Sequence, residues 1–460
     1  MKKSFILACI VALTTIVNIA IAQHNWTILY YAAGCNSSEE TLLQDLNEIK
    51  NATRDNQGYR IITLIDRVEG FSSDANTFGE DFTDTRLYEI TEQNFRRVSG
   101  RELLPEITNT SVHDANMGDA NTLKRFIMFG KKYYPASHYA LFVYSHGDGI
   151  SFSADIESDR DALYPAEITD VLTAQESVSL IAMDVCSMAG IEVAYQWRPQ
   201  KNKFGANYLV ASAPVSAPWD YASIFNRLSK SGAQKKIDPT KMSPEDFGNL
   251  LIEEIYNSQP WCSWGFFDLS KAGKVKSAID SYIKANSIDS HRKVLKDAQT
   301  KTIEYLPTFD AANASYYRMR IPYFDAFDLF RQLKDHNPVD NTAVDDILTA
   351  IDELVVQSFY ATGGNFLKPT DHFVNGQNGV YIFFPFGKEL YPYSNKIHWA
   401  EQKFYSPKMF RSTNSYGNLM WCADGATGGN GKVENWFELL DAMFDDHRLA
   451  AGDGYNGYHY

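Results

Sequence analysis

The sequence has few cysteines, and none of them lie close together. Its 460 residues include five, at positions 9, 35, 186, 262 and 422. Closely paired cysteines of the Cys-x-x-Cys type mark zinc sites, and dense cysteines mark disulfide scaffolds. Neither pattern is present, so neither kind of protein is indicated. The sequence alone leaves open whether one disulfide bridge forms among Cys35, Cys262 and Cys422.

An excess of basic residues is also missing. The formal net charge is -14 at pH 7, with 43 Lys and Arg against 57 Asp and Glu. Nucleic acids and anionic membranes attract basic surfaces, so this balance disfavours both as the main partner. It weakly favours a cationic substrate. The chain also lacks internal repeats and low-complexity tracts.

Only one stretch is apolar enough to enter a bilayer, and it lies at the start. Two lysines precede an apolar run over 5–17, and residues 20–22 (Ala-Ile-Ala) match the small-x-small pattern of a cleavage site. We therefore expect a signal peptide over 1–22. A retained anchor is the alternative, although the run is shorter than the ~20 residues of a membrane span. The mature protein is expected to be exported, as a periplasmic, cell-surface or secreted protein without an integral membrane span.

In the first half of the chain, strand-like apolar runs alternate with amphipathic stretches. This alternation is typical of βαβ units, which form an α/β fold with a mostly parallel sheet and helices on both faces. The expected strands are 26–33, 59–67, 138–149 with its terminal glycine-rich turn, 178–186 and 207–214, and the expected helices are 41–50, 121–135, 166–175 and 189–198.

Beyond residue 220 the pattern loosens, and we expect a second unit of the α+β type. The division predicted is a catalytic domain over 23–290 and a C-terminal domain over 291–460 packed on it. The segments that carry this prediction are helices at 244–258, 269–287, 323–335 and 343–361, strands at 264–269 and 379–387, and a loop at 422–432.

Two of the predicted strands end in residues suited to nucleophilic chemistry. His146 lies in the glycine-rich turn "SHGDG" that ends the segment 138–149, and Cys186 ends the strand 178–186 in "DVCSMAG". Ligands of open α/β sheets bind at the carboxyl ends of the parallel strands, so both side chains can reach one edge. A helix after Cys186 would lower the pKa of its thiol. The backbone N–H groups of Gly147 and Cys186 could form an oxyanion hole, and His146 could protonate a leaving amine.

A cysteine or histidine taken alone is more often a structural residue. The two turns together, with His146 and Cys186 40 residues apart, are more specific, and they resemble the clostripain family of cysteine peptidases, relatives of caspases, legumains and gingipains. Further similar segments are "NWTILYYAA", "DLNEI", "GDANTLKRFIMFGKKYYPASHYALFVYSHGDG", "IEVAYQWR", "VASAP…PWDY" and "GVYIFFP". The resemblance implies a caspase-like three-layer sandwich, a Cys-His dyad at Cys186 and His146, and cleavage after Arg or Lys.

The resemblance also implies an acidic specificity pocket. Asp184, two residues before the cysteine, corresponds to the family's pocket acid, and a carboxylate there would bind a basic side chain. The alternative is that Asp184 caps the following helix. Ser212 and Asp220 are further pocket candidates. Relatives commonly carry an acid after the Ala-Ser pair, where this chain has Ala213 and Pro214.

The polar segment 151–165 between the two turns is predicted to be an exposed loop. Family members are often zymogens that cut themselves between the histidine and the cysteine, which makes Arg160 the candidate self-cleavage site. Some relatives need calcium, and Asp155, Glu157 and Asp159 are weak candidate ligands. A solvated acidic loop is the alternative, and no other metal or cofactor is expected.

The function expected is therefore an exported cysteine endopeptidase that acts on peptides or proteins with basic residues. We expect a monomer that activates itself and becomes nicked into two chains. Two alternatives stay open. One is a catalytically inactive caspase-like module that binds peptides or glycans. The other is a different Cys-His enzyme, such as an acyltransferase or thioesterase.

Overall fold

The structure is a computed structural model that describes residues 24–444. Its gaps are residues 56, 230–235, 260–261, 306–321, 337–341, 361–366, 369–371, 386–415 and 428–429. The expected signal peptide over 1–22 lies outside the described residues. Within the described ranges, no helix combines the length and the apolar character that crossing a bilayer requires.

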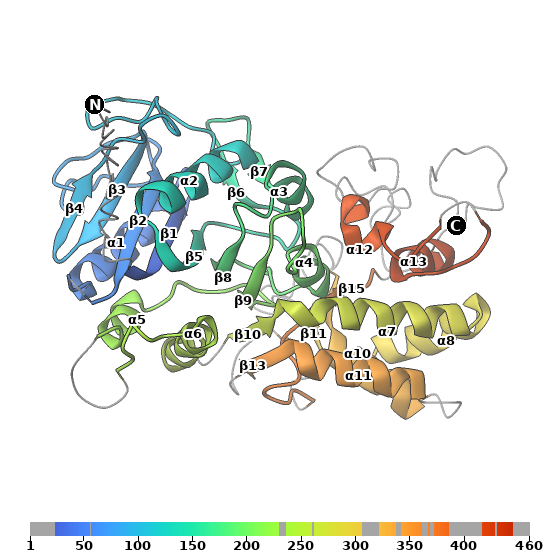
Figure 1. Cartoon of the computed structure of the whole chain (residues 1–460). Coiled ribbons are helices and arrows are strands. Elements are labelled where there is room, and N and C mark those ends of the chain that lie inside the picture. Colours follow the sequence, from blue (N-terminus) through green and yellow to red (C-terminus); the bar gives the residue numbers. More distant parts are fainter. Residues whose placement is uncertain are drawn as a thin grey trace, which may run out of the picture.

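A nine-stranded sheet forms the centre of the molecule (Figure 1). Its strand order is β13-β10-β9-β8-β5-β1-β2-β3-β4. The five strands from β9 to β2 run parallel, and they are the five strands expected from the sequence. The strands are β1 (His24–Ala33), β2 (Tyr59–Asp66), β3 (Thr85–Thr91), β4 (Asn94–Arg97), β5 (Ala136–Tyr144), β8 (Val178–Asp184), β9 (Ala206–Ser212), β10 (Ser263–Asp268) and β13 (Val355–Tyr360).

Helices cover both faces of this sheet, so the predicted α/β three-layer arrangement is confirmed. Alternate residues of each buried strand enter two separate cores, as in β1, where Leu29 and Tyr31 join one cluster and Ile28 and Tyr30 the other. The first core is closed by α2 (Ala120–Tyr133), α3 (Pro165–Val171), α4 (Ile191–Gln196) and α7 (Ala272–Ala285). The second is closed by α1 (Glu39–Ala52), α5 (Tyr221–Arg227) and α6 (Pro244–Ser258).

The second half of the chain adds a four-stranded antiparallel sheet and several helices beside the main sheet. The strand order of this small sheet is β14-β11-β12-β15. The elements are β11 (Glu304–Tyr305), β12 (Tyr323–Asp325), β14 (Leu367–Lys368), β15 (Tyr381–Phe383), α8 (Ile288–Gln299), α10 (Ala326–His336), α11 (Thr342–Leu354), α12 (Met420–Ala423) and α13 (Trp436–Phe444).

One predicted helix is wrong over its last turns. The helix expected over 343–361 ends at Leu354, and residues 355–360 form β13, which pairs antiparallel with β10. Two adjacent β-branched residues, Val355 and Val356, begin this strand. Pairing with the edge strand β10 stabilises the extended conformation of this segment. The main sheet thus includes strands from both sides of the expected boundary at 290/291, and the division into two domains stays a prediction.

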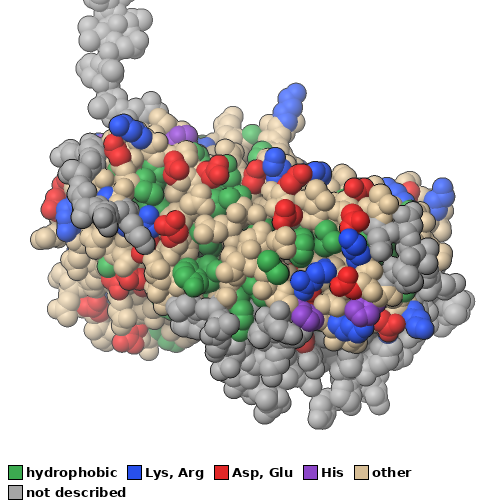
Figure 2. All heavy atoms as spheres, turned by 90° about the horizontal axis from the view of Figure 1, so that it is seen from below, with side chains coloured by type: hydrophobic (Ala, Val, Ile, Leu, Met, Phe, Trp, Pro, Cys, Tyr) green, Lys and Arg blue, Asp and Glu red, His purple; other side chains and the backbone are tan. Residues whose placement is uncertain are grey.

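Charges of both signs are interspersed on the face seen in Figure 2. Over the described part of this face, Lys and Arg side chains lie among Asp and Glu side chains rather than in a patch of their own. This distribution agrees with the sequence-based argument against a polyanionic partner.

Candidate active site

His146 and Cys186 leave the same edge of the central sheet. In the register of β5 and β8, Tyr144 lies opposite Asp184, and the two candidate residues each follow two positions later. The loops that carry them are in contact, because a Cβ added to Gly147 would lie 3.0 Å from the carbonyl oxygen of Cys186. The fold therefore brings together the two loops that carry the imidazole and the thiol singled out from the sequence.

Cys186 is half-buried in a turn that precedes helix α4. The backbone N–H of Ser216 donates to its Sγ at 3.4 Å, and the Ser216 hydroxyl lies 3.7 Å from the same atom. Burial nevertheless raises the pKa of the thiol. The expectation that a helix terminus lowers this pKa is wrong for this structure, since α4 begins only at Ile191 with Gly190 as its N-cap. Burial therefore favours the neutral form of the Cys186 thiol.

His146 lies at the surface beside the turn that follows β1. Its Nε2 is 2.9 Å from the hydroxyl of Ser37, a residue that the sequence analysis missed. Desolvation lowers the pKa of His146, so the imidazole is neutral near pH 7. A neutral imidazole can accept a proton, which is what a neutral thiol must lose to become a nucleophile.

Asp184 is buried beneath the nucleophile rather than at a helix cap. Its Oδ2 accepts hydrogen bonds from the backbone N–H of Trp219 at 3.4 Å and from the hydroxyl of Tyr221 at 3.2 Å. Helix α4 has Gly190 at its N-cap, so the capping alternative for Asp184 is not what the structure shows. Burial raises the pKa of Asp184 despite these two bonds.

A second buried carboxyl, Asp45 of helix α1, lies close to Asp184. Asp45 is 3% exposed, and its Oδ2 has no hydrogen-bond partner among the described residues. Burial and the charge of Asp184 both raise the pKa of Asp45. The sequence analysis missed this residue, although one signal was available. Asp45 lies on the face of α1 that buries Leu42, Leu46 and Ile49, where an unpaired acid is costly.

The other two pocket candidates have structural bonds of their own. The buried hydroxyl of Ser212 donates to the carbonyls of Pro214 and Ser263, both at 3.0 Å, and so braces the segment that follows β9. Asp220 caps α5, where it accepts from the backbone N–H of Ser223 at 2.9 Å and from its hydroxyl at 2.6 Å. Their roles in substrate binding stay predictions.

The segment 151–165 is a short hairpin, β6 (Phe152–Asp155) and β7 (Asp161–Leu163), rather than an irregular loop. Arg160 is exposed near its tip, and both Asp159 and Arg160 have left-handed backbone angles, with φ of 55° and 60°. Asp155 points inward to Cys35, whereas Glu157 and Asp159 are exposed. The roles of these acids in calcium binding and of Arg160 in processing stay predictions.

Two tyrosines from the small second sheet reach the candidate catalytic loops. Tyr381 donates from its hydroxyl to the carbonyl of Ser187 at 2.7 Å, and Tyr323 donates to the carbonyl of Asp148 at 2.6 Å. Their rings stack with centroids 4.0 Å apart and an interplanar angle of 15°. The stack, here called the tyrosine pair, thereby joins the loop after His146 to the loop after Cys186. Sequence spacing gave no signal for it.

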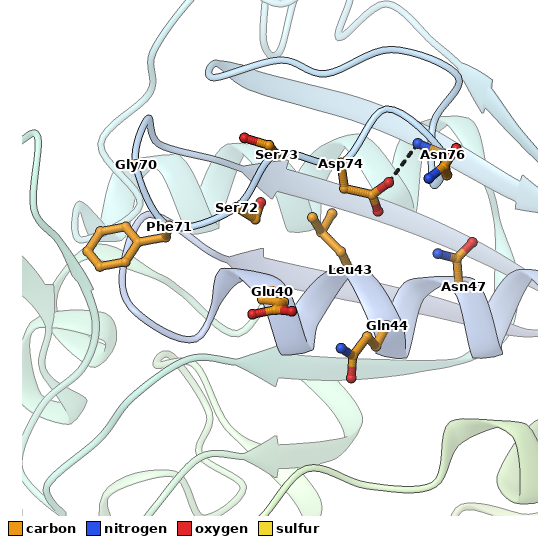
Figure 3. Close-up of a pocket in the computed structure, with 10 residues that line it drawn as sticks. All are labelled: Glu40, Leu43, Gln44, Asn47, Gly70, Phe71, Ser72, Ser73, Asp74 and Asn76. Atoms are coloured by element: carbon orange, nitrogen blue, oxygen red, sulfur yellow. Dashed lines mark hydrogen bonds between the residues drawn. The ribbon is translucent and has the colours of Figure 1, made fainter.

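A groove of about 720 Å³ lies elsewhere, on the outer side of α1 (Figure 3). It is open to solvent and mostly polar, and none of the candidate site residues lines it. Its lining includes Glu40, Gln44, Asn47 and the segment 70–74. The groove is therefore separate from the edge that carries His146 and Cys186.

The four cysteines of the described chain are all free thiols. Cys35 donates to Asp155 at 3.3 Å, Cys262 to the carbonyl of Val215 at 3.2 Å, and Cys422 to the carbonyl of Tyr416 at 3.2 Å. The bridge that the sequence left open among these three is not formed in the structure.

The chain is similar to proteins of a known family over most of its length. The model of the clostripain family, peptidase C11, matches residues 30–436. Clostripain of Hathewaya histolytica is 34% identical over 474 residues, which cover 94% of this chain and 89% of the relative.

Two solved structures share the fold. A secreted C11 cysteine protease from Bacteroides thetaiotaomicron, in complex with an irreversible peptide inhibitor, has a TM-score of 0.55 and 15% identity, over 87% of this chain and 99% of that chain. An inactive zymogen C11 protease from Parabacteroides distasonis has a TM-score of 0.51 and 14% identity, over 79% and 92%. They confirm the caspase-like α/β sandwich. The sequence matches carry the assignment further: the chain belongs to the clostripain family of cysteine peptidases.

Proposed function

We propose that this peptidase hydrolyses peptide bonds after Arg or Lys, with Cys186 as nucleophile and His146 as its base and acid. The observation that carries the proposal is the register of β5 and β8, which directs the thiol and the imidazole to one edge of the sheet. Exposure of His146 and partial exposure of Cys186 leave both reachable by a substrate.

The neutral resting forms of both groups suit a stepwise reaction. The Cys186 thiol transfers its proton to His146, and the sulfur attacks the carbonyl carbon of the substrate. The N–H groups of Gly147 and Cys186 stabilise the oxyanion that forms. His146 then gives its proton to the departing amine, which leaves a thioester on Cys186. Attack by water on this thioester releases the acid and restores the thiol.

The preference for basic residues rests on the carboxyl pair of Asp184 and Asp45. Two buried acids side by side have an unfavourable interaction that a guanidinium or ammonium group would relieve. Asp45 supplies, from helix α1, a second carboxylate for a pocket in which this chain has Ala213 where relatives commonly carry an acid. Its unpartnered Oδ2 is a hydrogen-bond acceptor left for the ligand.

Export and self-activation complete the proposal. One structural neighbour is described as secreted and another as an inactive zymogen. The exposed position of Arg160 in the hairpin between His146 and Cys186 supports cleavage there, since exposed loop tips are preferred sites of nicking. The left-handed backbone at Asp159 and Arg160 has to become extended before the peptide bond can enter an active site.

The test of this function is amide hydrolysis that depends on a thiol. Peptides that end in Arg, Lys, Leu or Asp before a fluorogenic amine are incubated with the purified chain, with and without prior iodoacetamide. We expect release only from the Arg and Lys peptides, and its loss after alkylation. The alkylated residue, identified by peptide mass, is expected to be Cys186. Absence of hydrolysis with tight peptide binding would favour the binding module, and thioester hydrolysis without amide hydrolysis would favour the thioesterase.

The tyrosine pair should act on the reaction rather than on the fold. Changing Tyr381 or Tyr323 to Phe removes one hydrogen bond to a catalytic loop, a loss of about 1 kcal/mol. We expect kcat to fall about threefold to tenfold with little change in KM, because the pair positions the loops and does not touch the substrate.

The matched control for this pair is Tyr416→Phe. Tyr416 donates to the buried carboxyl of Glu192 at 3.0 Å and so also joins the second half of the chain to α4. Its replacement should lower the melting temperature and leave kcat unchanged. If all three variants lose stability alike and none loses kcat, the tyrosine pair is only structural.

A further inference from the structure

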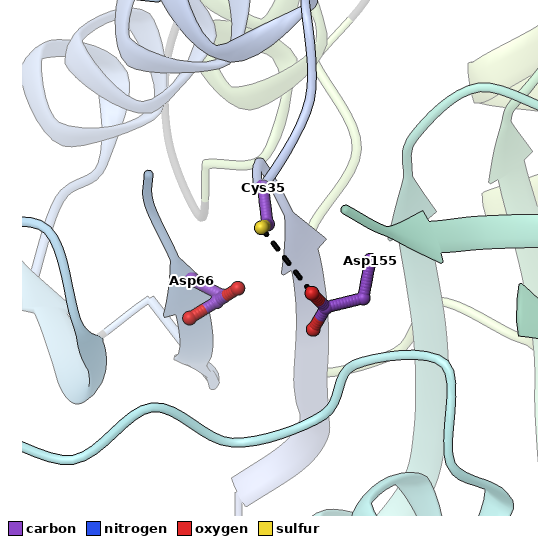
Figure 4. Close-up of side chains that lie close together, drawn as sticks. All are labelled: Cys35, Asp66 and Asp155. Atoms are coloured by element: carbon purple, nitrogen blue, oxygen red, sulfur yellow. Dashed lines mark hydrogen bonds between the residues drawn. The ribbon is translucent and has the colours of Figure 1, made fainter. Parts of the chain in front are cut away.

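Cys35 lies in a buried cluster with two carboxyl groups, outside the machinery proposed above (Figure 4). Cys35 follows β1, Asp66 ends β2, and Asp155 ends β6. One donor atom from each of the three lies within 4.8 Å of the other two. Figure 4 shows the three side chains converging from separate strands. The cluster thus draws on three elements that meet at one end of the sheet.

Burial makes this cluster unfavourable as it stands. Cys35 and Asp155 are each 1% exposed, and Asp66 is fully buried. The Oδ1 of Asp66 accepts from the hydroxyl of Thr85 at 2.6 Å, but its Oδ2 has no partner in the described part of the chain. Burial and the charges of Asp155 and of another carboxyl, Asp114, all raise the pKa of Asp66. An unpartnered carboxylate oxygen in this position calls for a cation or a proton.

Two arginines near the cluster form ion pairs with other acids, although the buried Nη1 of Arg67 has no partner among the described residues. Arg67 follows Asp66 directly, yet its guanidinium donates to Glu39 and Asp81, both at 2.8 Å. Arg86 pairs with Asp84 at 2.8 Å and with Glu80. Neither guanidinium forms an ion pair with Asp66 or Asp155, so neutralisation of the cluster is left to a proton or to a cation from solution.

Asp155 is held ready to act as a ligand. Its Oδ2 accepts from the backbone N–H of Met117 at 2.9 Å, and its Oδ1 accepts from those of Glu157 and Ser158 at 3.0 and 3.1 Å. The Oδ2 accepts only one of these bonds and so keeps a lone pair for a metal ion, whereas Oδ1 already accepts two. Such outer bonds are typical of carboxylates that ligate metals.

We propose that Cys35, Asp66 and Asp155 bind a divalent transition-metal ion, with Zn²⁺ as the best fit and solvent as the remaining ligand. The Sγ of Cys35 is 3.3 Å from Asp155 Oδ1. Ligands of a tetrahedral Zn²⁺ with bonds of about 2.0–2.3 Å are separated by about 3.3–3.8 Å. The exposed carboxyls of Glu157 and Asp114 lie on the solvent side and offer a path of entry.

The thiol decides the class of ion. Sulfur ligands select zinc-like ions, whereas Ca²⁺ takes six to eight oxygens and gains nothing from a thiol. On binding, the ion displaces the proton of the Cys35 thiol, which is released to solvent. The ion would join the ends of β1 and β2 to the hairpin that carries Arg160. This inference does not rest on the proposed peptidase reaction.

The experiment uses the full chain carrying Cys186→Ala, which removes the half-buried thiol and any dependence on peptidase activity. Co²⁺ is added as a spectroscopic probe, since a thiolate ligand gives it a near-ultraviolet charge-transfer band. We expect one equivalent of Co²⁺ to produce this band, one equivalent of Zn²⁺ to abolish it, and a large excess of Ca²⁺ to leave it unchanged.

Variants in the same background identify the ligands. Cys35→Ser should remove the Co²⁺ band, and Asp66→Asn should weaken Zn²⁺ binding by about tenfold or more. The control is Cys422→Ser, which removes another buried thiol. This control should keep the Co²⁺ band and the Zn²⁺ affinity of the parent. Circular dichroism shows whether each variant is folded. If Cys35→Ser does not fold, the Zn²⁺ affinity of Asp66→Asn tests the proposal instead. No band, a band that survives in Cys35→Ser, or displacement by Ca²⁺ as efficient as by Zn²⁺ would overturn the proposal.

Discussion

Replacing Asp184 with Asn is expected to lower kcat/KM for an arginine substrate about a hundredfold to a thousandfold. A desolvated cation that loses its charged partner costs about 3–4 kcal/mol, and each 1.4 kcal/mol is a factor of ten. Asparagine keeps the size of the side chain, and its amide oxygen can still accept from Trp219 and Tyr221. The measurement is kcat/KM for matched Arg and Leu peptides, of which only the first should fall.

Asp45→Asn tests the second carboxyl of the pair. We expect a fall of about tenfold to a hundredfold for the arginine substrate, because Asp184 still supplies one charge. Glu40→Gln is the matched control, since Glu40 lies on the same helix but on the outer groove. An Asp45→Asn enzyme that keeps its full preference for Arg over Leu would remove Asp45 from the pocket.

The same carboxyl pair predicts the direction of a pH effect. The pKa of both groups is raised, so near neutral pH the empty pocket holds protons that a bound cation must displace. The kcat/KM for an arginine substrate should therefore rise between about pH 6 and about pH 9, and less steeply in Asp45→Asn. The raised pKa of Cys186 also favours a rise. The rate of its alkylation without substrate, measured across the same range, separates the two effects.

Stability should change with pH in the opposite sense. A carboxyl whose pKa is higher in the folded than in the unfolded chain stabilises the fold while it is protonated. That contribution is complete below the unfolded pKa and is lost as pH rises through the folded one. Thermal melts of Asp45→Asn should accordingly lose less stability between acidic and alkaline pH than melts of the parent.

Cys186→Ala is expected to remain a single intact chain, while the parent is recovered as two fragments after denaturation. The physical reason is that the proposed nucleophile is also the agent of the cut. Mass spectrometry of the denatured proteins gives the result, and the new carboxyl end is expected at Arg160. Processing of Cys186→Ala at the parent's rate would show that another protease makes the cut.

Arg160→Gln is the companion variant for processing. It removes the basic side chain from the hairpin and leaves His146 and Cys186 in place, so the chain should stay intact while Cys186 still reacts with iodoacetamide. A cut elsewhere between the two residues in this variant would move the processing site without touching the assignment of the nucleophile.

The parallel half of the fold could be predicted because each of its strands is an apolar run, and helices alternate with most of them. The strands at the two edges of the sheet could not be predicted from the sequence. In β3 and β4, polar and charged residues such as Arg86, Glu89 and Arg96 interrupt the pattern, and only pairing with β2 makes the hairpin a strand pair. The β13 segment continues the apolar periodicity of α11, so its conformation depends on β10, a neighbour that sequence spacing cannot reveal.

The candidate site likewise has residues that could be predicted from the sequence and residues that could not. His146 and Cys186 each follow a strand that the sequence shows, so their common edge follows from the topology. Ser37, Asp45 and the tyrosine pair reach that edge from other elements, and their roles depend on tertiary packing. Of these residues, only Asp45 could have been noticed in the sequence, because it is an acid on an apolar helix face.

The strand order has a consequence for a cut chain. Cleavage at Arg160 would assign β1 to β6 to one fragment and β7 onward to the other. The seam between the fragments would then run through the middle of the sheet, where β5 and β8 pair along five residues of each strand. This boundary lies within the packed core of the sheet and not at a surface between two folded units. The two fragments would therefore stay associated, and neither would be expected to fold without the other.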